Sequence, residues 1–124
     1  MPTVLIVEDD PLIALDLSQT IAEATGAEVV VATSIAAAEQ HLARRMDFVL
    51  LDVNVCHETT FALARRLVEQ GVSCAFASGA SRAIIPDDLK ALPFLAKPCR
   101  AQLVISAVRA ALPTSKARAC QQRP

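Results

Sequence analysis

Three short apolar runs in this chain each end in charged residues, and this pattern limits the folds open to the chain. Residues 4–7 lead into Glu8, Asp9 and Asp10, residues 48–51 into Asp52, and residues 94–96 into Lys97 and Pro98. Apolar runs of this length between turn residues are typical of buried strands. In a parallel sheet the carboxyl ends of neighbouring strands share one edge, so we expect these charges to converge there. Carboxylates that lie so close repel one another unless a cation offsets their charge.

Five strand-like segments alternate with helix-like segments along the chain. Strands are expected over residues 3–7, 27–32, 46–51, 72–77 and 93–96, and helices over 11–25, 35–45, 59 or 60 to 71, 82–92 (interrupted by Pro86) and 100–112. Asp10 and Pro11 are typical of an N-cap and a first helical position, and Gly26 of a helix end. The alternation predicts an α/β fold, a flavodoxin-like, doubly wound, five-stranded parallel sheet with strand order 2-1-3-4-5 and helices on both faces.

Composition excludes several classes of function. The 124 residues suit one domain with a net charge of −1, and they contain no block of basic residues and no Trp or Tyr. We therefore expect no nucleic-acid partner. No apolar run approaches the roughly 20 residues of a membrane-spanning helix. No secretory signal is visible, and the four cysteines lack Cys-x-x-Cys spacing, so we expect reduced thiols, a cytoplasmic location and no membrane partner. Residues 113–124 are expected to form a polar, disordered tail beyond a domain of residues 1–112.

The residues at the strand ends suit phosphoryl transfer to a carboxylate. An exposed aspartate such as Asp52 can act as a nucleophile toward phosphorus. Asp9 and Asp52 can bind Mg²⁺ directly, and Glu8 through a bound water, because this ion prefers oxygen ligands. Lys97 can neutralise Asp52 and then a phosphoryl oxygen. The Ser78 hydroxyl, after the fourth predicted strand, can donate to another phosphoryl oxygen.

With these residues in this order, the chain resembles a response-regulator receiver domain of two-component signalling over about residues 3–112. The resemblance implies that the backbone carbonyl of Asn54 is a further Mg²⁺ ligand. It also implies a histidine kinase or a histidine phosphotransfer protein as the phosphoryl donor, and a downstream protein target that the sequence does not name. The segment Phe76-Ala77-Ser78-Gly79 is similar to the Phe-Ala-Thr-Gly pattern of single-domain FATGUY-type receivers, with Ser in place of Thr.

One position agrees with the receiver pattern and others depart from it, and all of them concern the output of the signal. Phe94 lies three residues before Lys97, where receivers often carry a switching aromatic residue, and permanent burial of this ring is the alternative. Ala80 follows Gly79, where FATGUY-type chains often place an aromatic residue, and Cys99 follows Pro98, where many receivers have Phe. Phosphorylation needs none of these rings. The departures therefore bear on the switch and leave the chemistry intact.

Three functions remain to be compared. The first is a stand-alone phosphoacceptor, because no DNA-binding or catalytic module follows residue 112. Such a protein is not an enzyme, beyond self-phosphorylation from small donors and self-dephosphorylation. The second is a receiver-like binding module that works without phosphorylation, which would have no need of the acidic, hydroxyl and lysine positions. The third is a haloacid-dehalogenase-like phosphatase, which would place a second Asp where this chain has Asn54. We predict the first.

Overall fold

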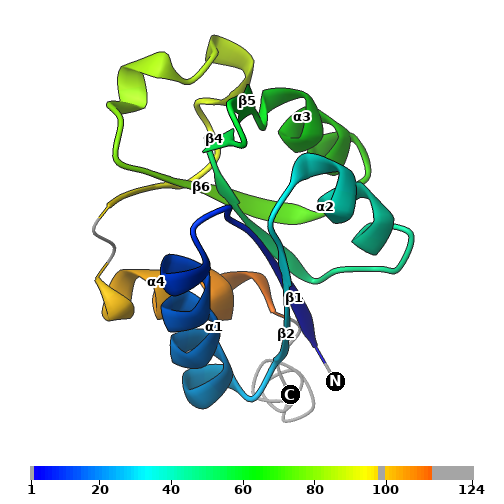
Figure 1. The fold of residues 1–124 in the computed structure, drawn as a ribbon, viewed down its shortest axis with the longest axis vertical. Helices are drawn as coiled ribbons and strands as arrows, with labels where there is room; N and C mark the ends of the chain where they lie inside the picture. The colour runs from blue at the N-terminus through cyan, green and yellow to red at the C-terminus, as the bar shows by residue number, and fades with distance from the viewer. Residues whose placement is uncertain (1, 98–99, 113–124) are drawn as a thin grey trace, which may run out of the picture.

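Five parallel strands form the centre of the molecule, and helices cover both faces of the sheet (Figure 1). The computed structural model describes residues 2–97 and 100–112. The elements of the main sheet and its helices are β1 (Thr3–Val7), α1 (Pro11–Thr25), β2 (Glu28–Ala32), α2 (Ile35–His41), β3 (Phe48–Asp52), α3 (Phe61–Glu69), β6 (Ser73–Ser78), β7 (Phe94–Ala96) and α4 (Ala101–Ala111). Two very short strands, β4 (Asn54–Val55) and β5 (Glu58–Thr59), form a separate antiparallel hairpin.

The order of the strands in the main sheet is β2-β1-β3-β6-β7. When only the five strands of this sheet are numbered along the chain, β6 is the fourth and β7 is the fifth. The predicted strand order 2-1-3-4-5 is therefore confirmed, as is the α/β fold. The register pairs Val7 with Leu51, and Asp52 with Ala77. The carboxyl ends of β1, β3 and β6 therefore lie side by side at one edge, which is the edge predicted to carry the charges.

Alternate side chains of the sheet pack into two separate hydrophobic layers, because successive residues of a strand face opposite sides. One layer packs β1 and β3 against α2 and α3, with Leu5, Val49 and Leu67 among its fully buried members. The other packs the same strands against α1 and α4, with Ile6, Leu50 and Ile21. Figure 1 shows the two helix pairs on opposite faces. All five residues of β1 are buried, so this strand holds both layers together.

The predicted helix ends of α1 are confirmed. The Asp10 carboxylate accepts hydrogen bonds from the backbone N–H groups of Leu12 (2.9 Å) and Ile13 (3.3 Å), which have no partner within the helix. Gly26 adopts φ 72°, a left-handed conformation that glycine reaches without strain, and its N–H donates to Ala22. The start of α1 is thereby placed immediately after the acidic run.

The structure differs from the predictions in three segments. Helix α2 ends at His41, before the predicted residue 45, and Leu42 caps it. The segment 53–58, predicted as a loop, contains the β4–β5 hairpin. The segment 82–92, predicted as an interrupted helix, forms two 3₁₀ turns, η1 (Arg82–Ile84) and η2 (Asp87–Leu89), on either side of Pro86. A proline removes a backbone donor and constrains the residue before it, which prevents one continuous helix here.

No helix within the described residues is both long and apolar enough to span a bilayer. The predictions for residues 113–124, Pro98 and Cys99 lie outside the described residues.

The β4–β5 hairpin turns through two residues in an unfavourable backbone conformation. Cys56 has φ 53° and His57 has φ 67°, and a two-residue hairpin turn of type I′ requires positive φ at both positions. Asn, Asp and Gly are the usual residues there, since other side chains are strained in this region. The hairpin therefore stores backbone strain beside the acidic edge of the sheet.

We predict that His57→Gly leaves stability unchanged or raises it by up to about 1 kcal/mol, because glycine relieves the positive-φ strain while adding entropy to the unfolded chain. The His57 side chain is exposed, so its loss removes no packing. Urea unfolding followed by far-ultraviolet circular dichroism measures the change. The matched control is Gln19→Gly on the exposed face of α1, which should cost about 1 kcal/mol. An equal loss of stability in His57→Gly and Gln19→Gly would contradict the presence of strain at His57.

Candidate acidic site

Asp52 is the last residue of β3, between the ends of β1 and β6. The four residues before it are fully buried, while its own side chain is 14% exposed. A central strand thus carries the carboxylate rigidly to the rim of the sheet and leaves it within reach of a reactant. This is the arrangement that the sequence predicted for Asp52.

Glu8 and Asp9 follow β1 but occupy different environments. The Glu8 side chain is only 3% exposed, and its Oε2 accepts a hydrogen bond from the Asp10 backbone N–H (3.3 Å). Asp9 is exposed, and its Oδ2 accepts a hydrogen bond from the Cys56 backbone N–H (2.8 Å). The β4–β5 hairpin therefore orients Asp9, although 47 residues separate Cys56 from Asp9 in the chain.

The Lys97 ammonium bridges two of these carboxylates. Its Nζ lies 2.5 Å from Glu8 Oε1 and 3.2 Å from Asp52 Oδ2. Its side chain is 18% exposed. Burial alone would lower the pKa of Lys97, but the hydrogen bond to Glu8 and the charge of Asp52 outweigh burial and raise this pKa above its ordinary value. Lys97 is therefore a fixed positive charge at neutral pH.

The pKa of Glu8 is raised above its ordinary value. Burial is the main cause, and the neighbouring Asp52 adds to it, while the hydrogen bond from Lys97 offsets part of the effect. A buried carboxylate beside a second carboxylate is costly in its charged form. Lys97 is the only cation that the described structure pairs with Glu8. The site thus carries net negative charge that a further cation would neutralise.

The acidic cluster suits a small divalent cation. One oxygen from each of Glu8, Asp9 and Asp52 lies within 4.8 Å of the others, and the three side chains run from buried to exposed. Carboxylate oxygens are hard ligands of the kind that Mg²⁺ prefers, and this ion commonly keeps several waters beside one or two carboxylates. Cys56 and His57 join no such cluster among the described residues, so neither is a candidate ligand.

Ser78 ends β6 beside the same edge. It is 4% exposed, and its Oγ accepts a hydrogen bond from the Ala80 backbone N–H (3.0 Å). Its carbonyl accepts a hydrogen bond from the Lys97 backbone N–H (2.9 Å). Ser78 therefore lies between β3 and the strand that carries Lys97, as predicted. Phe94, on β7, is half-buried and packs against the layer that contains α3.

Sequence reasoning missed two residues that hold the site together. The Thr60 hydroxyl donates a hydrogen bond to the Asp52 carbonyl (2.7 Å), and Cys56 holds Asp9 as described above. A threonine before an amphipathic helix is a common helix cap, so Thr60 gave no separate signal. The hairpin has no Asn-Gly or Asp-Gly pair at its turn, so the approach of Cys56 to Asp9 gave none either.

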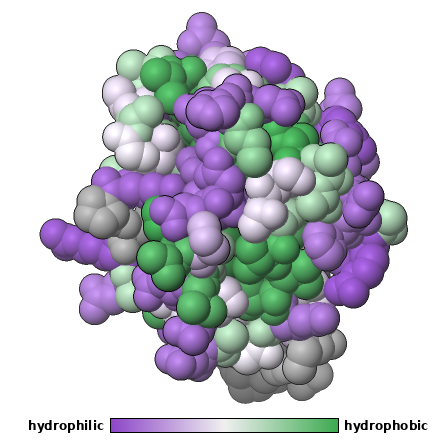
Figure 2. All heavy atoms as spheres, in the orientation of Figure 1, coloured by the Kyte–Doolittle hydropathy of each residue, from purple (hydrophilic) through white to green (hydrophobic). Residues whose placement is uncertain are grey.

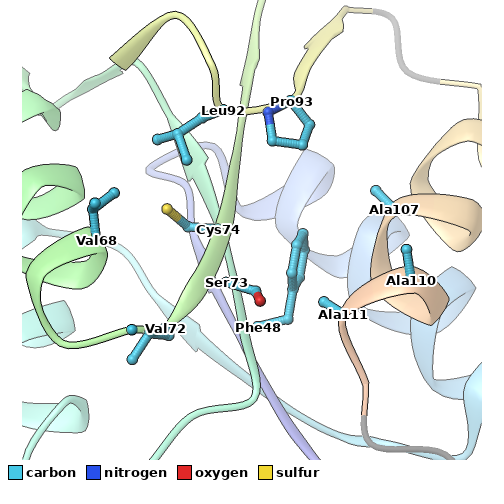
Figure 3. A pocket seen from close by; sticks show the side chains of 11 residues that line it. Phe48, Val68, Val72, Ser73, Cys74, Leu92, Pro93, Ala107, Ala110 and Ala111 are labelled. Carbon is cyan, nitrogen blue, oxygen red and sulfur yellow. The ribbon is translucent and has the colours of Figure 1, made fainter. Parts of the chain in front are cut away.

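An apolar hollow of about 400 Å³ lies away from the acidic cluster, between the ends of α3 and α4 (Figure 3). Phe48 and the alanines of α4 line one side, and Cys74 lies on the other with Val68 and Leu92. Burial raises the pKa of the Cys74 thiol to about 11, which leaves it protonated and unreactive. This lining has no converging charged groups, so the acidic cluster remains the candidate site.

Comparisons with known proteins agree with the geometry. A family model described as the response regulator receiver domain matches residues 4–109. The solved structure of SdrG from Sphingomonas melonis Fr1 is 29% identical, with a TM-score of 0.75 over 89% of this chain and 95% of SdrG. A sensor protein from Polaromonas sp. JS666 is 26% identical, with a TM-score of 0.76 over 89% of this chain and 94% of that chain.

A third similar structure is the response regulator TrrA from Thermotoga maritima in complex with Mg²⁺ and BeF. It is 19% identical, with a TM-score of 0.79 over 90% of this chain and 100% of TrrA, and this likeness shows the fold alone. No curated protein sequence matches the chain.

We predict that Lys97→Met destabilises the protein by about 1–3 kcal/mol without Mg²⁺, because a buried Glu8 would then face Asp52 with no counter-charge. Added Mg²⁺ should recover part of the loss, since a ligand of the folded state stabilises it. Urea unfolding with and without Mg²⁺ measures both effects. Lys90→Met removes the same charge from a lysine whose ammonium forms no described ion pair, and it is the matched control. A cost that is the same for both variants would refute the bridge.

The difference in stability between wild type and Lys97→Met should depend on pH in a defined direction. The folded-state pKa of Lys97 is raised above 10.5, so its stabilisation is full below that pH and declines as the pH rises further. The pKa of Glu8 is raised above 4.5, so protonation of Glu8 favours the folded state of the variant as the pH falls toward that value. The difference in the free energy of unfolding between wild type and Lys97→Met should therefore be largest near neutral pH. It should become smaller at both acidic and alkaline pH.

Proposed function

Because the chain belongs to the response regulator receiver domain family, we propose that Asp52 accepts a phosphoryl group from a histidine kinase or a histidine phosphotransfer protein. The observation that carries the proposal is the Lys97 ammonium in contact with both Glu8 and Asp52 at the rim of the sheet. Such a cation neutralises the carboxylates before transfer and is available to the phosphoryl oxygens afterwards. The protein is a signalling phosphoacceptor of two-component systems and acts in the cytoplasm.

The transfer forms one bond and breaks another. A carboxylate oxygen of Asp52 forms a bond to phosphorus, and the bond from phosphorus to the donor nitrogen or oxygen breaks, with its electron pair leaving on the donor. Lys97 follows the new negative charge, and the Ser78 hydroxyl donates to a second phosphoryl oxygen. Gly79 and Ala80 leave room for the backbone to approach the group.

The proposed Mg²⁺ ligands are Asp9, Asp52, the Asn54 backbone carbonyl and, through a water, Glu8. The hairpin supports the role of Asn54. Thr60 N–H donates to the Val53 carbonyl, so the alternating pattern of an antiparallel ladder turns the backbone groups of Asn54 away from Thr59. A bound Mg²⁺ would neutralise charge on the phosphoryl oxygens. TrrA, which shares this fold, was solved in complex with Mg²⁺ and BeF, which agrees with a Mg²⁺ site in a protein of this fold but does not identify its ligands.

The surface beside the site supports docking of a protein donor. Leu12 and Leu15 on α1 are 76% and 54% exposed, and α1 begins immediately after the acidic run. Figure 2 shows apolar surface over α1 and β2, with polar surface above it at the carboxyl end of β1. We propose that α1 contacts the kinase or phosphotransfer protein there, so that the donor histidine reaches Asp52.

We predict a mass increase of one phosphoryl group when the protein is incubated with acetyl phosphate and Mg²⁺, and no increase with Asp52→Ala. Asp9→Asn keeps an oxygen for the Cys56 N–H but loses a metal-binding charge, so labelling should slow by more than about tenfold. Intact-mass spectrometry over time measures all three. If wild type takes no phosphoryl group from acetyl phosphate or from a cognate kinase, the receiver-like binding module that works without phosphorylation replaces the proposal.

We propose that the signal leaves through the segment 79–93. The Ser78 hydroxyl now accepts from Ala80, and a phosphoryl group on Asp52 would draw this hydroxyl away. Ile85 and Leu89 are buried, and a bidentate ion pair between Arg65 and Asp88 connects the segment to α3. Irregular segments with few anchors are the parts of a protein that rearrange at low cost.

The test of this output is hydrogen exchange with and without beryllofluoride, a phosphoryl mimic. Protection should change across residues 78–94 in wild type, and much less in Ser78→Ala. Phe94→Ala should accept the mimic at Asp52 yet show an altered response around β7, if the half-buried ring takes part in the switch. An unchanged exchange pattern across this segment in wild type would rule out the proposed route, whereas the chemistry at Asp52 would stand.

A further inference from the structure

Thr60 lies where helix α3 begins, yet its hydroxyl serves strand β3. A threonine at this position normally accepts a hydrogen bond from the first turn of the helix. Here it makes no such bond. Its Oγ1 donates to the Asp52 carbonyl at 2.7 Å and lies 3.4 Å from the Val53 carbonyl. Thr60 is fully buried, so water cannot serve as a partner for this hydroxyl. The hydroxyl binds the backbone of Asp52 and does not cap the helix.

The same residue closes a loop that returns to the site. Thr60 N–H donates to the Val53 carbonyl (2.9 Å), and the β4–β5 pairs continue that ladder to the turn. At the turn, Cys56 N–H holds Asp9, and Cys56 Sγ donates to the Thr33 carbonyl (3.4 Å). The hairpin is therefore attached to Asp52 at its base and to Asp9 at its tip. Its strained turn persists because these attachments hold it.

This connection sets the relative position of two carboxylates. The direction of the Asp52 carbonyl and the direction of its side chain are linked through one Cα, so a peptide held by Thr60 also limits where the carboxylate can point. Asp9 and Asp52 must both approach one small ion, and their oxygens already lie within 4.8 Å. Displacements of about 1 Å at a reacting centre can slow a reaction about a hundredfold.

We infer that Thr60 is a positioning residue for phosphoryl transfer and for Mg²⁺ binding. It acts through the backbone of Asp52 and contacts neither the phosphoryl group nor the Mg²⁺ ion. The inference rests on the proposed phosphorylation of Asp52 for its kinetic part, and on the acidic cluster alone for its metal part. It also assigns a role to the β4–β5 hairpin, which transmits the constraint from Thr60 to Asp9.

The test compares Thr60→Val, Thr60→Ala and Thr60→Ser with wild type. Val keeps the shape without the hydroxyl, Ala removes the hydroxyl without risk of crowding, and Ser restores it. The measurements are Mg²⁺ affinity by titration calorimetry and the initial rate of labelling by acetyl phosphate at saturating Mg²⁺. The matched control is Thr25→Val, because Thr25 Oγ1 also donates to a backbone carbonyl at 2.7 Å (that of Ile21) but does so at the far end of α1.

Thr60→Val and Thr60→Ala should weaken Mg²⁺ binding and slow labelling by about tenfold or more. Thr60→Ser should restore both, and Thr25→Val should leave both unchanged even where it lowers stability. The inference is overturned if the variants without the hydroxyl bind Mg²⁺ and label as wild type does, or if Thr25→Val causes equal losses at equal stability. If wild type binds Mg²⁺ but never labels, the proposed function fails, while the Mg²⁺ affinities still decide the role of Thr60.

Discussion

The structure depends on one ammonium group placed between two carboxylates. Glu8 is almost fully buried beside Asp52, and such an arrangement is unfavourable until a cation enters it. Lys97 supplies that cation from the last strand of the sheet. Since Glu8, Asp52 and Lys97 lie at the carboxyl ends of β1, β3 and β7, this partial neutralisation is complete only after the whole sheet has formed. The negative charge of the acidic cluster is thus partly compensated by contacts between strands that are distant in the chain.

Much of the fold and most of the site followed from the sequence, for physical reasons. Apolar runs ending in charge identify strands and their carboxyl ends, and parallel pairing then brings Glu8, Asp9 and Asp52 together. Lys97 and Ser78 followed from the same reasoning. The caps at Asp10 and Gly26 are local effects, which sequence reports well because neighbouring residues supply both donor and acceptor.

The parts that could not be predicted depend on contacts between distant residues. Nothing within residues 53–60 marks a hairpin, because Cys56 and His57 adopt positive φ only where the attachments to Asp9, Thr33 and Asp52 hold them. The diversion of Thr60 from capping is equally invisible, since its acceptor lies eight residues earlier in the chain. Pro86 indicated a break in the helix, but propensity alone could not show that 3₁₀ turns would form on both sides.

The two 3₁₀ turns also have an evolutionary consequence. Segment 79–93 is held to the body of the protein mainly by Ile85, Leu89 and one ion pair, while its other side chains are largely exposed. Exposed positions that support neither a helix nor the core can change with little loss of stability. Beyond Ala80, the face that we propose for output therefore carries none of the carboxylates, the lysine or the serine of the proposed phosphorylation site. Duplicated copies of such a gene could acquire different partners while keeping the same acidic cluster.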